Sequence, residues 1–319
     1  MEIIRRIEDI TNMDKTAVAL GNFDGVHLGH QKLISETVDR AKQEGVKSAV
    51  FTFSNHPSGL IPGVKAVKSI LTDERKAGLI EELGVDYLFD VPFTEELRDM
   101  EAEDFVRELL VGRMNVQEAF CGYNYQFGAH AFGTSEILEM FGEKYGFNVY
   151  EMPPFEIDGH VVSSSLIRIL IEKGYVSRIK TFMGRHYEIE GEVVVGNRLG
   201  KKLGFPTSNL ELNEQMAAPP NGVYTTYCIY NGVRYPSITN VGNKPTVGDF
   251  DKNVETHIFD FDKELYGKNI TVELLKKMRD EQKFDSLDDL SAQIVKDCNE
   301  ARTWFEEQNN PCNSNAGSI

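Results

Sequence analysis

The chain has 319 residues, of which 41% are hydrophobic, and a formal net charge of −16 at pH 7. This length suits two domains, and the acidic balance disfavours nucleic acid or an anionic membrane surface as a partner. The charged start "MEIIRRIEDI" predicts that there is no secretory leader, and the lack of a long apolar run predicts no membrane span. The cysteines are scattered, which predicts a cytoplasmic protein without a disulfide framework or zinc site; they are Cys121, Cys228, Cys298 and Cys312.

The first half of the chain alternates short apolar runs with helical stretches. Strands are expected over residues 16–20, 48–53, 86–91, 117–122 and 147–152. Residues 29–45 predict a helix that ends at Gly45, with one apolar face formed by Leu33, Ile34, Val38 and Ala41. Strands that alternate with helices predict a parallel sheet covered on both faces.

The second half reads as closely spaced strands. They are expected over residues 187–196, 223–242, 254–262 and 268–279, with a hairpin turn at Asn231-Gly232. Strands without intervening helices predict an antiparallel barrel. One helix follows, capped by Ser286, with a stripe made of Leu287, Leu290, Ile294 and Ala301. We therefore expect domains at residues 1–182 and 183–306, followed by a disordered polar tail at 307–319.

A glycine-containing loop follows the first strand. Its residues are Gly21, Asn22, Phe23, Asp24 and Gly25. The loop lies where open α/β sheets bind ligands, and glycines with free helical N–H groups suit phosphate.

Two histidines start the next helix. His27 and His30 bracket Gly29, which leaves room for a triphosphate. Both imidazoles can stabilise charge on the α-phosphate and the departing pyrophosphate without a covalent intermediate. The alternative is a helix cap with two surface histidines.

A serine run precedes a later helix. Ser163, Ser164 and Ser165 can cap this helix and bind phosphate, and Arg168 lies one turn further on. A guanidinium there can clamp a phosphate through charge-assisted hydrogen bonds. The alternative is plain capping with a surface arginine.

A second glycine loop lies in the second half. Gly196 and Gly200 are one residue too close for a P-loop, and Lys202 stands where serine or threonine should follow, so this loop would cradle phosphate in another fold. Thr207 and Asn209 then offer two neutral oxygens on one face, which suit Mg²⁺. The alternative is a simple turn at a proline.

Glu255 alternates with His257 along an otherwise apolar strand. An inward carboxylate is costly unless it is paired or used, and it can serve as a general base for an attacking hydroxyl. The alternative is an exposed charge on an edge strand.

The first-half motifs "GNFDGVHLGHQ", "FTFSNHP", "GYNYQFG" and "VSSSLIR" resemble the adenylyltransferase module of bacterial bifunctional riboflavin kinase/FAD synthetases. The resemblance implies a Rossmann-like nucleotidyltransferase fold in which His27 and His30 hold ATP phosphates. The residues that it implies for the rest of the nucleotide site are Asn124, Ser164, Ser165 and Arg168. Ser165 replaces the usual threonine. His56 follows Asn55, where proline is common, so its role is open between a site residue and the end of a strand.

The second-half segments "GFPTSNL", "VETHIFDFD" and "LLKKMRDEQKFDSLDDLSAQIVKD" resemble the riboflavin kinase module of the same family. The resemblance implies that Thr207 and Asn209 hold Mg-ATP and that Glu255 activates the ribityl hydroxyl. It also places Arg279 near the flavin and Lys201, in place of arginine, near a phosphate. Together the two modules cover residues from about 15 to 305.

The predicted protein is a bifunctional enzyme with small-molecule substrates and no nucleic acid or membrane partner. It phosphorylates riboflavin with ATP to FMN, then joins FMN to AMP to give FAD and pyrophosphate, with Mg²⁺. Two alternatives remain at this point: a flavin-binding regulator with kinase activity only, and an adenylyltransferase for a phosphopantetheine-like substrate.

Overall fold

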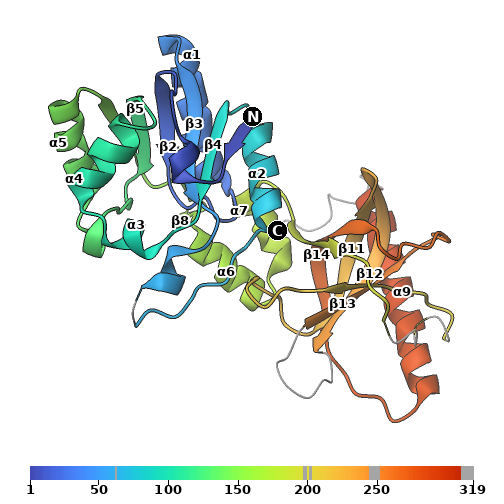
Figure 1. Ribbon diagram of the computed structural model, residues 1–319. Coiled ribbons are helices and arrows are strands. Elements are labelled where there is room, and N and C mark those ends of the chain that lie inside the picture. Colours follow the sequence, from blue (N-terminus) through green and yellow to red (C-terminus); the bar gives the residue numbers. More distant parts are fainter. Residues whose placement is uncertain (62, 197–199, 201–202, 244–251, 310–319) are drawn as a thin grey trace. The chain divides into compact units, whose positions relative to one another are not determined.

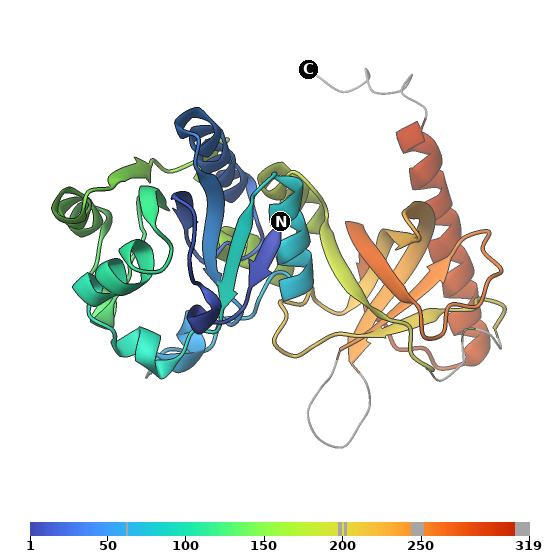
Figure 2. The same cartoon turned by 45° about the horizontal axis from the view of Figure 1, so that its top comes forward.

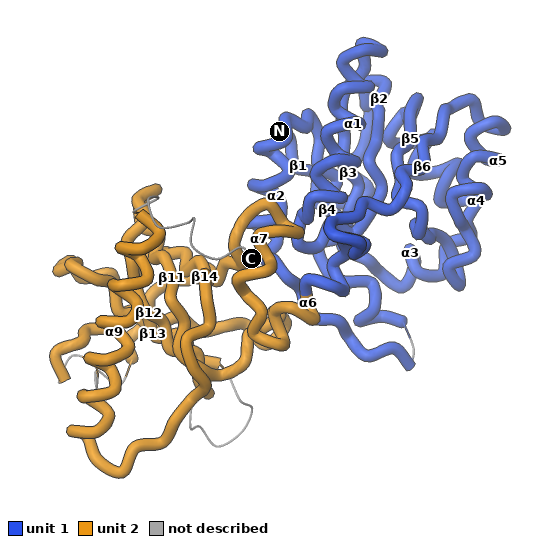
Figure 3. Tube along the Cα trace, turned by 180° about the vertical axis from the view of Figure 1, so that it is seen from behind, with its two compact units in different colours: residues 1–167 blue, residues 168–319 orange. Residues whose placement is uncertain are grey.

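The computed structural model describes residues 1–61, 63–196, 200, 203–243 and 252–309 (Figure 1). The chain divides into two compact units, residues 1–167 and 168–319, called unit 1 and unit 2 below (Figure 3). None of the helices within the described ranges is both long and apolar enough to cross a membrane.

Unit 1 is built on a six-stranded parallel sheet with strand order β1-β4-β3-β2-β5-β6. The strands are β1 (Glu2–Ile4), β2 (Thr16–Leu20), β3 (Lys47–Phe53), β4 (Tyr87–Val91), β5 (Val116–Gly122) and β6 (Asn148–Met152). The five predicted strands are confirmed within a residue at each end, and β1 is an addition at the edge. All five residues of β2 are buried, as expected for a central strand covered on both faces.

Helices cover the two faces of this sheet. On one face α1 (Leu28–Glu44) packs against β2, β3 and β5, and Gly45 ends it with φ of 67°. Its buried residues include Leu33, Ile34, Val38 and Ala41, so the predicted apolar face is confirmed. On the other face the core includes the helical residues Phe105–Val111 together with Val18 and Leu20. The remaining helices of this unit are α2 (Asp73–Glu82), α3 (Glu95–Asp99), α4 (Ala102–Asp104), α5 (Ser135–Tyr145) and α6 (Ser164–Glu172), the last of which runs into unit 2.

Unit 2 is an antiparallel six-stranded sheet with strand order β10-β13-β12-β11-β14-β9. The strands are β9 (Tyr187–Glu192), β10 (Ser208–Glu211), β11 (Gly222–Tyr230), β12 (Val233–Asn243), β13 (Lys252–Ile258) and β14 (Asn269–Asp280). An isolated bridge between Val194 and Asn209 brings the two edges together, so the barrel is nearly closed. The predicted strand over 187–196 is therefore too long, since regular pairing ends at Glu192.

The turn at Asn231-Gly232 connects β11 and β12, as predicted. Both residues have positive φ, 51° and 75°, which is what a two-residue hairpin turn requires. Asparagine and glycine tolerate this conformation better than other residues. The local chemistry of these two residues thus sets the register of the longest hairpin in the barrel.

Two helices accompany the barrel: α7 (Val176–Met183), against β9 and β14, and α9 (Leu287–Asn309), along its outside (Figure 2). Ser286 Oγ accepts a hydrogen bond from the Asp289 amide at 3.1 Å, which confirms the predicted cap. The predicted stripe is wrong at Leu287, which is 58% exposed, because the buried face of α9 comes from its second half. Cys298, Ala301 and Phe305 pack there against the barrel. The helix continues to Asn309, into the segment predicted to be disordered, and residues 310–319 lie outside the described residues.

Candidate active sites

The glycine-containing loop of unit 1 joins β2 to α1 at the carboxyl edge of the sheet. Phe23, at φ of 48°, turns its side chain into the core, and Gly25 has φ of 83°. The Asp24 carboxylate accepts hydrogen bonds from the Ile70 amide at 2.9 and 3.2 Å. Asp24 thus ties the loop to a distant segment, and its contact with phosphate stays a prediction, like those of Gly21, Asn22, Phe23 and Gly25.

The two histidines lie against each other at the start of α1. His27 is the N-cap residue, and its Nδ1 accepts a hydrogen bond from the His30 amide at 3.2 Å. The ring centroids are 3.5 Å apart with an interplanar angle of 19°. Because Nδ1 accepts, neutral His27 carries its proton on Nε2. A Cβ at Gly29 would come within 3.3 Å of both the His27 ring and Phe155, so this glycine permits the packing that holds His27.

The serine run meets the glycine-containing loop. Ser163 Oγ accepts from the Leu166 amide at 3.2 Å and caps α6. Ser164 and Ser165 lie inside the first turn, which corrects the prediction that all three serines precede the helix. Ser164 Oγ donates to the Asp24 carbonyl at 2.7 Å, joining two motifs 140 residues apart in sequence. Arg168 lies one turn further along the same helix.

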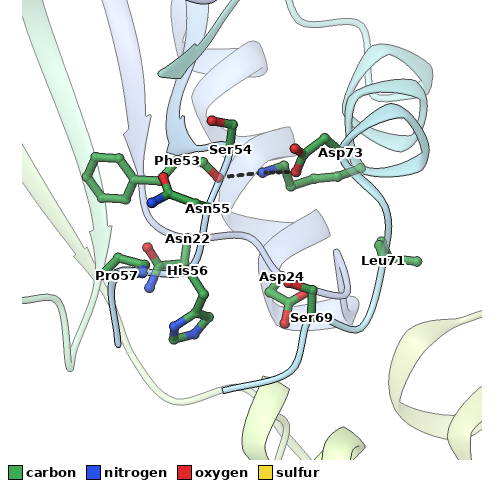
Figure 4. Close-up of a pocket in the computed structure, with 11 residues that line it drawn as sticks. Asn22, Asp24, Phe53, Ser54, Asn55, His56, Pro57, Ser69, Leu71 and Asp73 are labelled. Carbon is green, nitrogen blue, oxygen red and sulfur yellow. Dashed lines mark hydrogen bonds and ion pairs between the residues drawn. The ribbon is translucent and has the colours of Figure 1, made fainter. Parts of the chain in front are cut away.

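A pocket opens beside the same loop, where β3 ends (Figure 4). It is lined by Asn22, Asp24, Phe53, Ser54, Asn55, His56, Pro57, Ser69, Leu71, Asp73 and Lys76. His56 Nδ1 accepts from the Ser58 amide at 3.2 Å, so His56 caps a short helical turn after the end of β3. His56 also lines the pocket and lies three residues beyond the end of β3, so it is not simply the end of a strand. Asn124 lies in an exposed turn after β5, the neighbour of β2 in the sheet.

Lys76 is a pocket residue that the sequence analysis missed. It is buried, donates to the Phe53 carbonyl at 2.7 Å and pairs with Asp90 at 3.2 Å. Burial raises the pKa of the neighbouring Asp73, whose carboxylate lies 3.5 Å from the same ammonium group. The sequence pattern that could have revealed this buried lysine is its position on the apolar face of α2, beside Ala77 and Ile80.

In unit 2 the predicted metal ligands and the predicted base share one face of the barrel. Asn209 on β10 is the register partner of Glu255 on β13. Cross-strand partners carry their side chains on the same face, and Thr207 lies two residues before Asn209. Asn253, another residue that the sequence analysis missed, donates from Nδ2 to Glu255 Oε1 at 2.7 Å and to Asn209 Oδ1 at 3.5 Å. The fold thus brings together Asn209, Asn253 and Glu255 from two neighbouring strands, with Thr207 just before the first of them.

Gly196 and Gly200 lie against this cluster. A Cβ at Gly196 would come within 2.6 Å of the Asn209 amide group. A Cβ at Gly200 would clash with the Phe205 carbonyl and come within 3.4 Å of Thr207 Oγ1. Both positions therefore exclude larger residues, and backbone can approach a ligand there. Lys201 lies outside the described residues.

Glu255 is half-buried in the sheet, between β10 and β12, so the alternative of an exposed charge on an edge strand is wrong. Burial raises its pKa, and the hydrogen bond from Asn253 partly opposes this by stabilising the carboxylate. His257, two residues on, makes a 2.8 Å hydrogen bond from Nδ1 to the Pro206 carbonyl. This bond anchors the start of the segment that carries Thr207 and Asn209.

Arg279, on β14, is held by α9. Its Nε and Nη2 donate to the two carboxylate oxygens of the buried Asp297, at 3.1 and 2.7 Å. Such a two-point ion pair fixes the plane of the guanidinium group. The predicted contact of Arg279 with flavin stays a prediction.

The donor set of this face suits Mg²⁺ bound with ATP. Among the residues that the structure describes, no group of three or more His, Cys, Asp or Glu side chains could hold a metal ion by itself. Neutral oxygens from Thr207 and Asn209 fit an ion that takes most of its ligands from phosphates and water.

Comparisons with known proteins match both halves of the chain. The family model described as FAD synthetase matches residues 9–166, and the model described as riboflavin kinase matches residues 183–305. The bifunctional riboflavin kinase/FMN adenylyltransferase of Bacillus subtilis is 36% identical over 298 residues, which cover 91% of this chain and 93% of that protein. The enzyme of the same name from Escherichia coli K12 is 33% identical over 308 residues, covering 96% and 98%.

A solved structure described as the macrolide-efflux protein of Streptococcus pneumoniae also matches, with a TM-score of 0.86, 29% identity and coverage of 95% of this chain and 98% of that one. The name macrolide-efflux protein applies to that structure and is not carried over to this chain. The two family models and the curated relatives favour the bifunctional interpretation over both alternatives raised by the sequence. The chain therefore belongs to the family of bifunctional riboflavin kinase/FMN adenylyltransferases, with a FAD synthetase module followed by a riboflavin kinase module.

Proposed function

We propose that the Glu255 site carries out the phosphorylation of riboflavin by ATP, which gives FMN and ADP. The His27 and His30 site then transfers AMP from a second ATP to FMN, which gives FAD and pyrophosphate. The register of β10 and β13, which sets Asn209 opposite Glu255, is the observation that best supports the first assignment. The hydrogen bond from Ser164 to Asp24 supports the second.

In the kinase module, Thr207 and Asn209 would hold Mg²⁺ with ATP, and the ion would neutralise charge on the phosphates. Glu255 accepts the proton of the ribityl hydroxyl as that oxygen attacks the γ-phosphate. The backbone at Gly196 and Gly200 approaches the phosphates, and Lys201 adds a positive charge there. Arg279 contacts the flavin.

In the adenylyltransferase module, catalysis rests on hydrogen-bond donors that are already oriented. His27, held through Nδ1, presents Nε2–H to the ATP phosphates, and His30 is stacked upon it. Ser164, Ser165, Arg168 and Asn124 complete the nucleotide and pyrophosphate site. The phosphate of FMN is already ionised when it attacks, so this step requires no general base.

We also propose the domain limits and the location. The first module ends near residue 182, ahead of the riboflavin kinase match, and the second ends near residue 306. Scattered cysteines support a reducing cytoplasm as the location.

A product assay on the full chain tests the proposed function. Riboflavin, ATP and Mg²⁺ are incubated with the protein, and the flavins are separated by chromatography. We expect FMN to form first and FAD to follow, with one pyrophosphate released per FAD. Accumulation of FMN without FAD, even when FMN is supplied, would identify a kinase-only protein. Failure to phosphorylate riboflavin would contradict the kinase assignment.

Replacement of Asn209 by alanine tests the metal site. The amide oxygen is lost without a change in charge, so we expect FMN formation to need about 10- to 100-fold more Mg²⁺, while FAD synthesis from supplied FMN keeps its normal Mg²⁺ dependence. The measurement is a Mg²⁺ titration of each activity. Asn269→Ala is the matched control, because Asn269 is an exposed asparagine at the start of β14 in the same barrel. A normal Mg²⁺ dependence in Asn209→Ala would remove this residue from the metal site.

A further inference from the structure

One face of β13 carries a side chain that no part of the proposed mechanism uses. Asn253 and Glu255 are two residues apart, so both project from the same face of the strand. The Asn253 amide nitrogen lies 2.7 Å from Glu255 Oε1 and 3.5 Å from Asn209 Oδ1. A single amide thus bridges the proposed base and a proposed metal ligand.

The orientation of this amide follows from its neighbours. Both nearby atoms are acceptors, so the nitrogen must face them, since a flipped amide would set Oδ1 against the Glu255 carboxylate. Oδ1 then points the other way, where it is buried and accepts no hydrogen bond from any described residue. An unsatisfied buried acceptor is costly, and such groups gather at functional sites.

We propose that Asn253 is a positioning residue of the kinase site, which holds the Glu255 carboxylate and the Asn209 amide in one hydrogen-bonded unit. The inference rests on the proposed roles of Glu255 and Asn209. The physical basis of the proposal is that a glutamate side chain has several rotatable bonds. Its carboxylate samples several positions unless a hydrogen bond holds one of its oxygens. With Oε1 held by Asn253, Oε2 is left for the attacking hydroxyl, and small misplacements of such a group are costly in rate.

The first test is Asn253→Ala in the full chain, with Asn269→Ala as the matched control. Loss of a group that orients a catalytic residue typically costs about 10- to 100-fold in activity, so we expect kcat for FMN formation to fall by that factor. KM for riboflavin should be essentially unchanged, because Asn253 contacts no substrate in this proposal. FAD synthesis from supplied FMN should also be unchanged. A raised KM with normal kcat, or kinetics equal to those of Asn269→Ala, would overturn the proposal.

A double-mutant cycle separates positioning from general damage to the barrel. If Asn253 acts through Glu255, the fold loss caused by Asn253→Ala should largely disappear in a Glu255→Gln background. An equal fold loss in both backgrounds would show a structural role and overturn the proposal. A normal turnover in Glu255→Gln itself would instead contradict the proposed base, so the two failures are distinguishable.

A binding measurement does not depend on residual activity. Mn²⁺ is used in place of Mg²⁺, and its affinity for the full chain is measured in the presence of ADP by paramagnetic resonance. We expect Asn253→Ala to weaken Mn²⁺ binding about 10-fold or more, because Asn209 loses the partner that orients it, and Asn269→Ala to leave it unchanged. Unchanged Mn²⁺ affinity in Asn253→Ala would exclude the link to Asn209.

Discussion

Replacing Glu255 by glutamine should lower the turnover of riboflavin phosphorylation by roughly 100- to 10,000-fold, the range for loss of a general base. Glutamine keeps the size of the side chain and loses its basicity. A primary hydroxyl is a poor nucleophile until its proton has an acceptor, and Glu255 is the carboxylate opposite Asn209 in the β10–β13 register. The measurement is the rate of FMN formation at saturating riboflavin and ATP.

Two controls accompany this variant. Flavin binding should be little affected, and FAD synthesis from supplied FMN should persist, because the FMN phosphate is already ionised. The Asn253 amide can still donate to the glutamine oxygen, so the local hydrogen bond survives the change. If flavin binding weakens while turnover at saturation stays normal, Glu255 is a binding residue and the base must be sought elsewhere.

Replacing His30 by alanine should lower the rate of FAD formation by about 100- to 1,000-fold, the cost of one lost donor to a transition-state charge. His30 stacks on His27, and its backbone amide, which donates to His27 Nδ1, is kept in the variant. The tautomer of His27 is therefore preserved, and the loss reports mainly on the His30 ring. The measurement is pyrophosphate release with FMN and ATP as substrates.

Riboflavin phosphorylation is the internal control for His30→Ala, since the two proposed sites lie in different modules. FMN formation should remain at the normal rate in the same preparation. Equal loss of both activities would point to misfolding or to one shared site. A normal rate of FAD formation would show that the imidazole of His30 does not act on the phosphates.

Several features followed from the sequence because they depend on near neighbours. The strand at 16–20 and the helix after it are set by apolar periodicity, and Gly45 ends that helix because it adopts the left-handed conformation. The Asn231-Gly232 turn needs two residues that tolerate positive φ. His27 and His30 are a helical turn apart, so their proximity was also a local property.

Other features depended on contacts between distant segments. No local pattern indicated that Ser164 would donate to Asp24, 140 residues away, or that Lys76 would be buried with Asp90 beside the pocket. The exposure of Leu287 was not predicted, because apolar spacing shows which face of a helix packs against the barrel but not which turns of the helix make contact. β10 has only four residues, too few to show a period.

Periodicity, turn chemistry and motif spacing are encoded along the chain, and from them came the two-module order, the parallel and antiparallel sheets and the main candidate residues. The pairing of Asn209 with Glu255, and the bridge that Asn253 makes between them, came from the folded barrel alone. Pairing register is set by the packing of whole strands, and a shift of one residue would turn these side chains to the opposite face. For this reason Asn253, which belongs to no sequence motif, could be recognised as a candidate residue only from the pairing of the strands.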